Sequence, residues 1–145
     1  MRTIARLAVE REELRVVADQ IGAPTSARVI AKAITIIVIG EGIDLAERFA
    51  AAGGLIHLAT AGETSWHGFA SAIVEGLRAR GANLRAKAIV PIRTQEYPTK
   101  AKRPANSRLQ LERLQRLFGI VPPRWNEALA KELDELIKEL DPSSG

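Results

Sequence analysis

Residues 55 to 91 constrain the fold most, because they have the pattern of a strand, a helix and a second strand. Residues 55–59 (Leu-Ile-His-Leu-Ala) and 86–91 (Ala-Lys-Ala-Ile-Val-Pro) are runs of strand length. Between them, apolar side chains recur at the spacing of an amphipathic helix: Trp66, Phe69, Ala70, Ile73, Val74 and Leu77. Thr64 is the expected N-cap of this helix, and Gly81 is its expected end. Strands that alternate with helices predict an α/β fold.

The rest of the chain extends this alternation. A β-branched run predicts a third strand over residues 14–18, and helices are expected over residues 1–12, 25–38, 44–52, 107–118 and 125–140. Thr25 and Ser107 are the expected caps of two of these helices. The prediction is a small three-strand sheet with about six helices, in a single domain over residues 1–140 followed by a disordered tail over 141–145. Such a narrow sheet leaves strand edges open to a partner.

Composition narrows the classes of function. The chain has 145 residues, no cysteine and two histidines, which excludes disulfides and disfavours a structural zinc site. It has no apolar run of membrane-spanning length and no apolar leader, so a cytoplasmic protein without membrane contact is expected. The net charge of +4 is modest, and the few aromatic residues are not interleaved with the cations, which argues against nucleic acid as a partner.

A proline-containing stretch over residues 94–109 is the strongest candidate for a ligand-binding segment. Its sequence is Thr-Gln-Glu-Tyr-Pro-Thr-Lys-Ala-Lys-Arg-Pro-Ala-Asn-Ser-Arg-Leu. Two prolines predict an ordered, extended loop instead of a helix. Fixed cations, one tyrosine ring and small hydroxyl and amide groups suit an anionic, polyhydroxylated ligand. The alternative is a solvated connector between a strand and a helix.

Several catalytic patterns fail on spacing or context. The sequence Gly40-Glu41-Gly42 follows a predicted helix and lacks the third glycine of a dinucleotide fingerprint. Lys100 lies three residues after Tyr97, and the intervening proline prevents the helix that would align a Tyr-x-x-x-Lys pair. His57 and His67 lack a recognisable nucleophile and acid around them, so structural roles are expected. The tryptophans Trp66 and Trp125 are expected in the core.

Three segments together resemble one family. Residues 13–25 (ELRVVADQIGAPT), 56–70 (IHLATAGETSWHGFA) and 91–109 (PIRTQEYPT through RPANSRL) occur in the same order in the C-terminal half of dTDP-4-dehydrorhamnose reductases. These enzymes are extended short-chain dehydrogenase/reductases. The similarity spans residues 2–133, and the block from Tyr97 to Leu109 is its most specific part.

The resemblance implies NADPH-dependent reduction of dTDP-4-dehydrorhamnose in dTDP-L-rhamnose synthesis. The family's cofactor fingerprint and its Tyr-x-x-x-Lys pair belong to an N-terminal half that this sequence lacks. We therefore expect a substrate-binding portion that binds a dTDP-sugar, binds no cofactor or metal by itself, has no catalytic residue and is inactive alone.

The resemblance also suggests substrate-binding residues, with Arg103 first because a guanidinium can bind phosphate oxygens in bidentate fashion. Tyr97, Asn106 and Gln20 are further candidates, whereas Ser107 is expected to serve as a helix cap. The alternative function is a non-catalytic regulatory or interaction subunit derived from the same family. Its exposed strand edges would pair with another chain or with a second copy of this one.

Overall fold

A computed structural model describes residues 1–39, 44–97, 99, 101 and 103–140 of the chain. Over these residues it contains six α-helices, four short strands and one 3₁₀ helix, in this order: α1 (Arg2–Glu10), β1 (Glu13–Val17), β2 (Ile21–Gly22), α2 (Ala27–Ile39), α3 (Leu45–Ala51), β3 (Thr64–Ser65), α4 (Trp66–Ala79), β4 (Ala88–Ile92), η1 (Thr94–Glu96), α5 (Glu112–Phe118) and α6 (Trp125–Leu140). Among the helices described, none is both long enough and apolar enough to cross a membrane.

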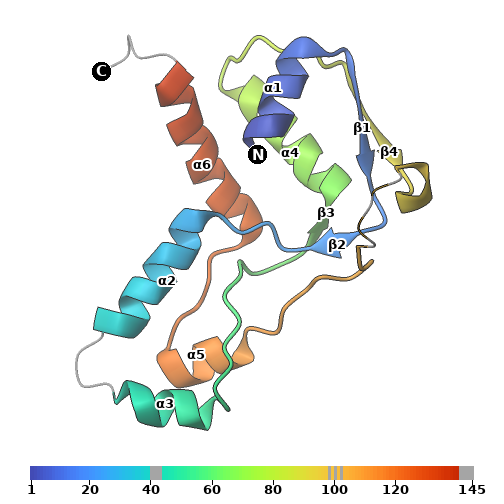
Figure 1. The fold of residues 1–145 in the computed structure, drawn as a ribbon. Coiled ribbons are helices and arrows are strands. Elements are labelled where there is room, and N and C mark those ends of the chain that lie inside the picture. The colour runs from blue at the N-terminus through green and yellow to red at the C-terminus, as the bar shows by residue number, and fades with distance from the viewer. Residues whose placement is uncertain (40–43, 98, 100, 102, 141–145) are drawn as a thin grey trace.

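One end of the molecule is built on α4 and a parallel pair of strands (Figure 1). Strands β1 and β4 pair in parallel, with Leu14 opposite Ile89 and Val17 opposite Ile92. Helix α4 packs against both strands and also contacts α1 and α6. Its apolar stripe is buried as the sequence pattern requires, with Ile73, Val74 and Leu77 almost fully enclosed.

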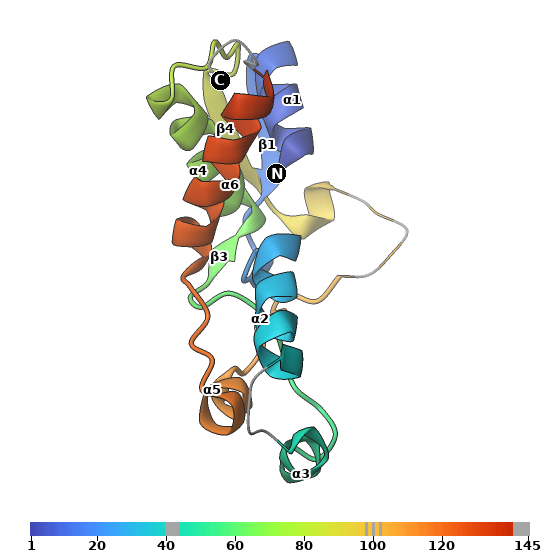
Figure 2. The same ribbon diagram turned by 90° about the vertical axis from the view of Figure 1, so that its left-hand side faces the viewer.

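Helices α2, α3 and α5 form the other end, below the strands in both views (Figure 2). They surround a separate core of buried apolar side chains: Ala33, Ile37, Leu114, Phe118 and Ile120. The rings of Phe49 and Phe118 pack with their centroids 5.5 Å apart. Helix α5 ends at Gly119, whose φ of 65° lies in the left-handed region that glycine adopts without a side-chain clash.

A second, antiparallel pair of strands lies between the two ends. Residues Ile21 and Gly22 of β2 pair with Ser65 and Thr64 of β3. On its other side, Ile21 forms an isolated parallel bridge with Asn106. Three segments that are far apart in the sequence therefore meet at β2.

The α/β class and the six helices are confirmed for the described residues, as are the strands predicted at 14–18 and 86–91 to within two residues. The strand predicted over residues 55–59 is wrong, because this segment has no strand partner in the described part of the chain. Ile56 and Leu58 instead pack against the core around α2 and α5. The small sheet is thus two separate pairs of strands. The predicted tail over 141–145 lies outside the described residues.

Each of the three predicted caps is displaced, because its residue is used elsewhere. The Thr25 hydroxyl accepts from Thr60 N at 3.1 Å, so the Ser26 hydroxyl accepts from Val29 N at the start of α2. Thr64 belongs to β3 and pairs with Gly22 of β2, and the Ser65 hydroxyl caps α4 by accepting from Gly68 N at 2.9 Å.

The predicted cap Ser107 is wrong by the largest margin. Its N–H donates to the carbonyl of Ile21 at 2.8 Å, so this residue is held in extended pairing and α5 begins only at Glu112.

Candidate functional site

The candidate site is the junction at which the loop after β4 crosses β2. Ile21 N donates to Ala105 O and Ser107 N donates to Ile21 O, both at 2.8 Å. On the opposite side of β2, the backbone pairs with Thr64 and Ser65. The three segments that carry the family resemblance therefore converge on β2, a strand of two residues, although 85 positions separate Ile21 from its bridge partner Asn106.

A cavity of about 150 Å³ lies at this junction. Its lining combines the backbone of β2 with small polar groups and one indole: Gln20, Ile21, Gly22, Ala23, Pro24, Thr64, Ser65, Trp66 and Ser107. A second cavity of about 320 Å³ shares Pro24 and Trp66 with the first and is walled by Phe69 and Trp125. The ring of Phe69 packs edge-on against both tryptophans, at 6.4 Å and 6.3 Å between centroids. Trp66 thus lies between two adjoining hollows.

A chain of hydrogen bonds fixes one side of the small cavity. Gln20, which is 9% exposed, donates from Nε2 to Thr94 Oγ1 at 3.1 Å. The Thr94 hydroxyl donates in turn to Asp19 Oδ1 at 2.6 Å, and Thr94 N also donates to the Asp19 carboxylate at 3.0 Å. These hydrogen bonds from Thr94 stabilise the charged form of Asp19 and lower the pKa of that carboxyl below its ordinary value. The amide orientation of Gln20 is set by this chain, because the hydroxyl proton of Thr94 is given to Asp19.

An ion pair closes the other side of the junction. Arg108 Nη1 contacts Glu63 Oε2, and Arg108 Nε donates to Asn106 Oδ1 at 3.0 Å. Asn106 Oδ1 also accepts from Arg108 N at 3.0 Å. Both ionic side chains are half exposed, so the pair adds little to stability but holds the 106–108 segment beside the loop that precedes β3.

The structure brings two of the four predicted substrate-binding residues to the junction. Gln20 lines the small cavity, and Asn106 bridges to β2 through its backbone while its side chain is exposed. Tyr97 is 58% exposed, Arg103 is exposed, and neither belongs to the described lining of the cavity. Both belong to the segment between η1 and Asn106. Their contact with a ligand stays a prediction.

Sequence reasoning missed four polar or aromatic contributors. Trp66 was expected in the core but is 50% exposed, because as the first residue of α4 it lies beyond the packed face of that helix. Asp19, Thr94 and Glu63 acquire partners only through long-range contacts. His67, in contrast, has the kind of structural contact that was expected, with Nε2 lying 3.1 Å from the carbonyl oxygen of Ile89.

Solved structures of reductases share this fold. A dTDP-4-dehydrorhamnose reductase from Bacillus anthracis, crystallised in complex with NADP, superposes with a TM-score of 0.73 at 30% identity and covers 92% of this chain. One from Clostridium acetobutylicum gives a TM-score of 0.71 at 28% identity and covers 94% of this chain. The chain accounts for 42% and 43% of these two structures. The fold is therefore that of part of a sugar-nucleotide reductase.

Sequence comparison agrees with the structures. The dTDP-4-dehydrorhamnose reductase of Burkholderia thailandensis is 46% identical over 145 residues, which covers 96% of this chain and 47% of that enzyme. An Escherichia coli reductase of the same name is 41% identical over 135 residues, with 93% and 43% covered. The chain spans less than half the length of these curated relatives. The family model of the RmlD substrate binding domain matches residues 1–138, and the chain belongs to this family.

Proposed function

We propose that this chain is the sugar-nucleotide-binding portion of a dTDP-4-dehydrorhamnose reductase-like protein. The observation that carries the proposal is the convergence of residues 20–24, 64–66 and 106–108 on one junction with a cavity beside it. These are the segments that carry the sequence resemblance, and a family described by substrate binding matches nearly the whole chain. The ligand class is a dTDP-sugar.

The chemistry of the junction and its loop fits the two ends of such a ligand. Arg103 is exposed on the loop, where a guanidinium can donate two parallel hydrogen bonds to the diphosphate. The amides of Gln20 and Asn106 and the phenol of Tyr97 can bind sugar hydroxyls. The half-exposed indole of Trp66 offers a flat apolar face next to the cavity.

The described residues do not fit a dinucleotide cofactor. A nicotinamide dinucleotide binds where a glycine-rich turn leads from a parallel strand into the N-terminus of a helix. Here β1 leads into β2, and β4 leads into the three-residue 3₁₀ helix η1. We therefore propose that the described residues neither hold this cofactor nor carry out hydride transfer. The expected result is no oxidation of NADPH by the 145-residue chain with dTDP-4-dehydrorhamnose; turnover by the pure chain would contradict this proposal.

Binding is the direct test. Titration calorimetry of the chain with dTDP-L-rhamnose should show binding, and Arg103→Ala should weaken it by roughly tenfold because charged hydrogen bonds contribute about 1.5–3 kcal/mol. Arg116→Ala, an exposed arginine on α5, is the matched control and should bind like the wild type. Equal affinity in all three proteins would remove Arg103 from the site. No binding by the wild-type chain would contradict the proposed function for the chain by itself.

A further inference from the structure

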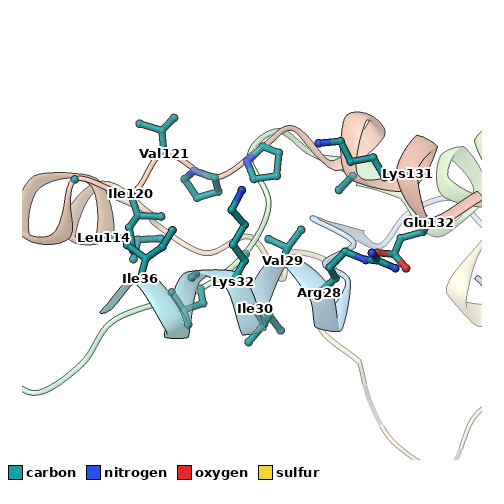
Figure 3. A pocket seen from close by; sticks show the side chains of 17 residues that line it. Arg28, Val29, Ile30, Lys32, Ile36, Leu114, Ile120, Val121, Lys131 and Glu132 are labelled. Carbon is teal, nitrogen blue, oxygen red and sulfur yellow. The ribbon is translucent and has the colours of Figure 1, made fainter. Parts of the chain in front are cut away.

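A third and larger cavity lies away from the junction, between α2, the segment that joins α5 to α6, and the first turns of α6 (Figure 3). It encloses about 500 Å³, within the range of small-molecule sites. It shares no lining residue with the 150 Å³ cavity beside β2, although Ala128 and Glu132 also line the 320 Å³ cavity that adjoins it. None of the four predicted substrate-binding residues lines this third cavity, so the proposed sugar-nucleotide site does not explain it. We call it the α2–α6 groove.

The interior of the α2–α6 groove is apolar. Its floor is formed by Ala33, Leu114 and Ile120, which belong to the buried core between α2 and α5. Ile36 and Val121 form part of its wall and are 42% and 71% exposed. When a ligand covers apolar area that is in contact with water, each Å² contributes about 25 cal/mol to the free energy of binding. The interior thus favours a hydrocarbon ligand and offers few hydrogen-bond partners to a polyhydroxylated ligand.

The rim of the groove carries an excess of positive charge. Arg28, Lys32 and Lys131 face one acid, Glu132. Arg28 Nε pairs with Glu132 Oε1 at 3.3 Å, so these two charges largely offset each other. Neither lysine forms an ion pair with the part of the chain that the structure describes. Figure 3 shows Lys32 extending from α2 and Lys131 from α6 toward the opening between these helices.

We propose that the α2–α6 groove binds an amphipathic carboxylate, an anion with a hydrocarbon chain and one charged end. The hydrocarbon chain of the ligand lies along Val29, Ile36 and Ile120, and its carboxylate lies between the ammonium groups of Lys32 and Lys131. Ammonium groups are compact, rotatable donors that suit a small, single anion at the mouth of a groove. Charge complementarity at the rim and apolar lining below it select this class over a neutral lipid and over a nucleotide.

The probe is decanoate, added below its micelle concentration to the ¹⁵N-labelled chain and followed by amide NMR. We expect saturable shifts at Ala33, Ile36, Val121 and Lys131. Affinity should fall with added salt, because the lysines are at the surface. The double variant Lys32→Gln with Lys131→Gln should bind about tenfold more weakly. Lys87→Gln, an exposed lysine beside β4, is the matched control and should leave the affinity unchanged.

Three results would overturn this inference. Decanol binding as tightly as decanoate would show that the lysines do not recognise charge. Shifts at the groove that follow protein concentration without ligand would make a second copy the occupant. Absence of groove shifts at every decanoate concentration would leave the groove without this ligand class. A thermal melt of each variant verifies folding, and a parallel dTDP-L-rhamnose titration separates this inference from the proposed function.

Discussion

Thr94 joins the loop that carries Tyr97 and Arg103 to the end of β1. Its hydroxyl accepts from Gln20 and donates to Asp19, and its N–H donates to the same carboxylate. One residue therefore fixes the orientation of a buried amide and lowers the pKa of an exposed acid. The backbone hydrogen bonds of Ile21 involve Ala105 and Ser107 and do not involve Thr94. A substitution of the Thr94 side chain therefore removes its hydroxyl hydrogen bonds and leaves the pairing at Ile21 in place.

The first prediction concerns Thr94→Val. Removing the hydroxyl takes away the largest cause of the lowered pKa of Asp19, so that pKa should rise toward its ordinary value. A carboxyl with a depressed folded-state pKa stabilises the fold above its unfolded pKa, and this contribution is lost as pH falls through the folded pKa. The stability gap between wild type and variant should therefore be present at neutral pH and shrink in acid. Carbon-detected NMR titration of Asp19 measures the pKa.

Thr3→Val serves as its control, because Thr3 is exposed on α1 and remote from Asp19. The control should leave the titration of Asp19 unchanged. An Asp19 pKa that is the same in wild type and in Thr94→Val would show that the hydrogen bond from the Thr94 hydroxyl does not lower it.

At the scale of the elements, helix α4 is capped by Ser65, a residue that the amphipathic pattern of the helix does not reveal. The Ser65 hydroxyl accepts from Gly68 N, whereas the neighbouring Thr64 hydroxyl makes a long contact of 3.4 Å to the Ser65 carbonyl. The helix is capped from inside β3, so its start and the strand pairing with β2 depend on adjacent residues.

The second prediction compares these two hydroxyls. Ser65→Ala should lower the free energy of unfolding by about 1 kcal/mol, the usual cost of a lost N-cap. Thr64→Val keeps the volume and β-branching and should cost less, since the lost hydrogen bond is long. Urea unfolding followed by circular dichroism measures both. A larger loss in Thr64→Val than in Ser65→Ala would reverse the assignment of the cap.

At the scale of the whole molecule, the parallel strands form only a two-stranded sheet over the described residues. The lateral edges of β1 and β4 therefore have backbone groups that can pair with another strand. Exposed apolar side chains on α2 add to the surface that a partner could cover, with Ile34, Val38 and Ile39 between 46% and 71% exposed. Both features fit a molecule that functions next to further protein.

The third prediction is that the chain self-associates or is marginally stable in isolation, because association would bury these edges. Light scattering coupled to size exclusion should show mass that rises with loading concentration, and the melting temperature should rise with it. A monomer with a sharp, concentration-independent melt would contradict this. A stable stoichiometric dimer that binds no dTDP-sugar would favour the interaction-subunit alternative.

The elements with a strong local pattern could be predicted from the sequence. The apolar spacing of α4 and α6, the glycine after α5 and the β-branched run of β1 act within a few residues, so composition and periodicity were enough. The family resemblance could also be recognised from the sequence, because each of its three segments is a contiguous block of residues. For the same reason, Gln20 and Asn106 could be chosen as candidates before their positions were known.

Only the tertiary structure decided how these blocks are used. Residues 55–59 have the composition of a strand but pack as an extended segment on the α2–α5 core, and Ser107 has the chemistry of a cap but is committed to Ile21. The Asp19–Thr94–Gln20 chain and the Glu63–Arg108 pair join residues 45 to 75 positions apart. Periodicity and propensity are local, whereas strand pairing and side-chain partnership depend on which distant backbone arrives alongside, and that is set by packing of the whole chain.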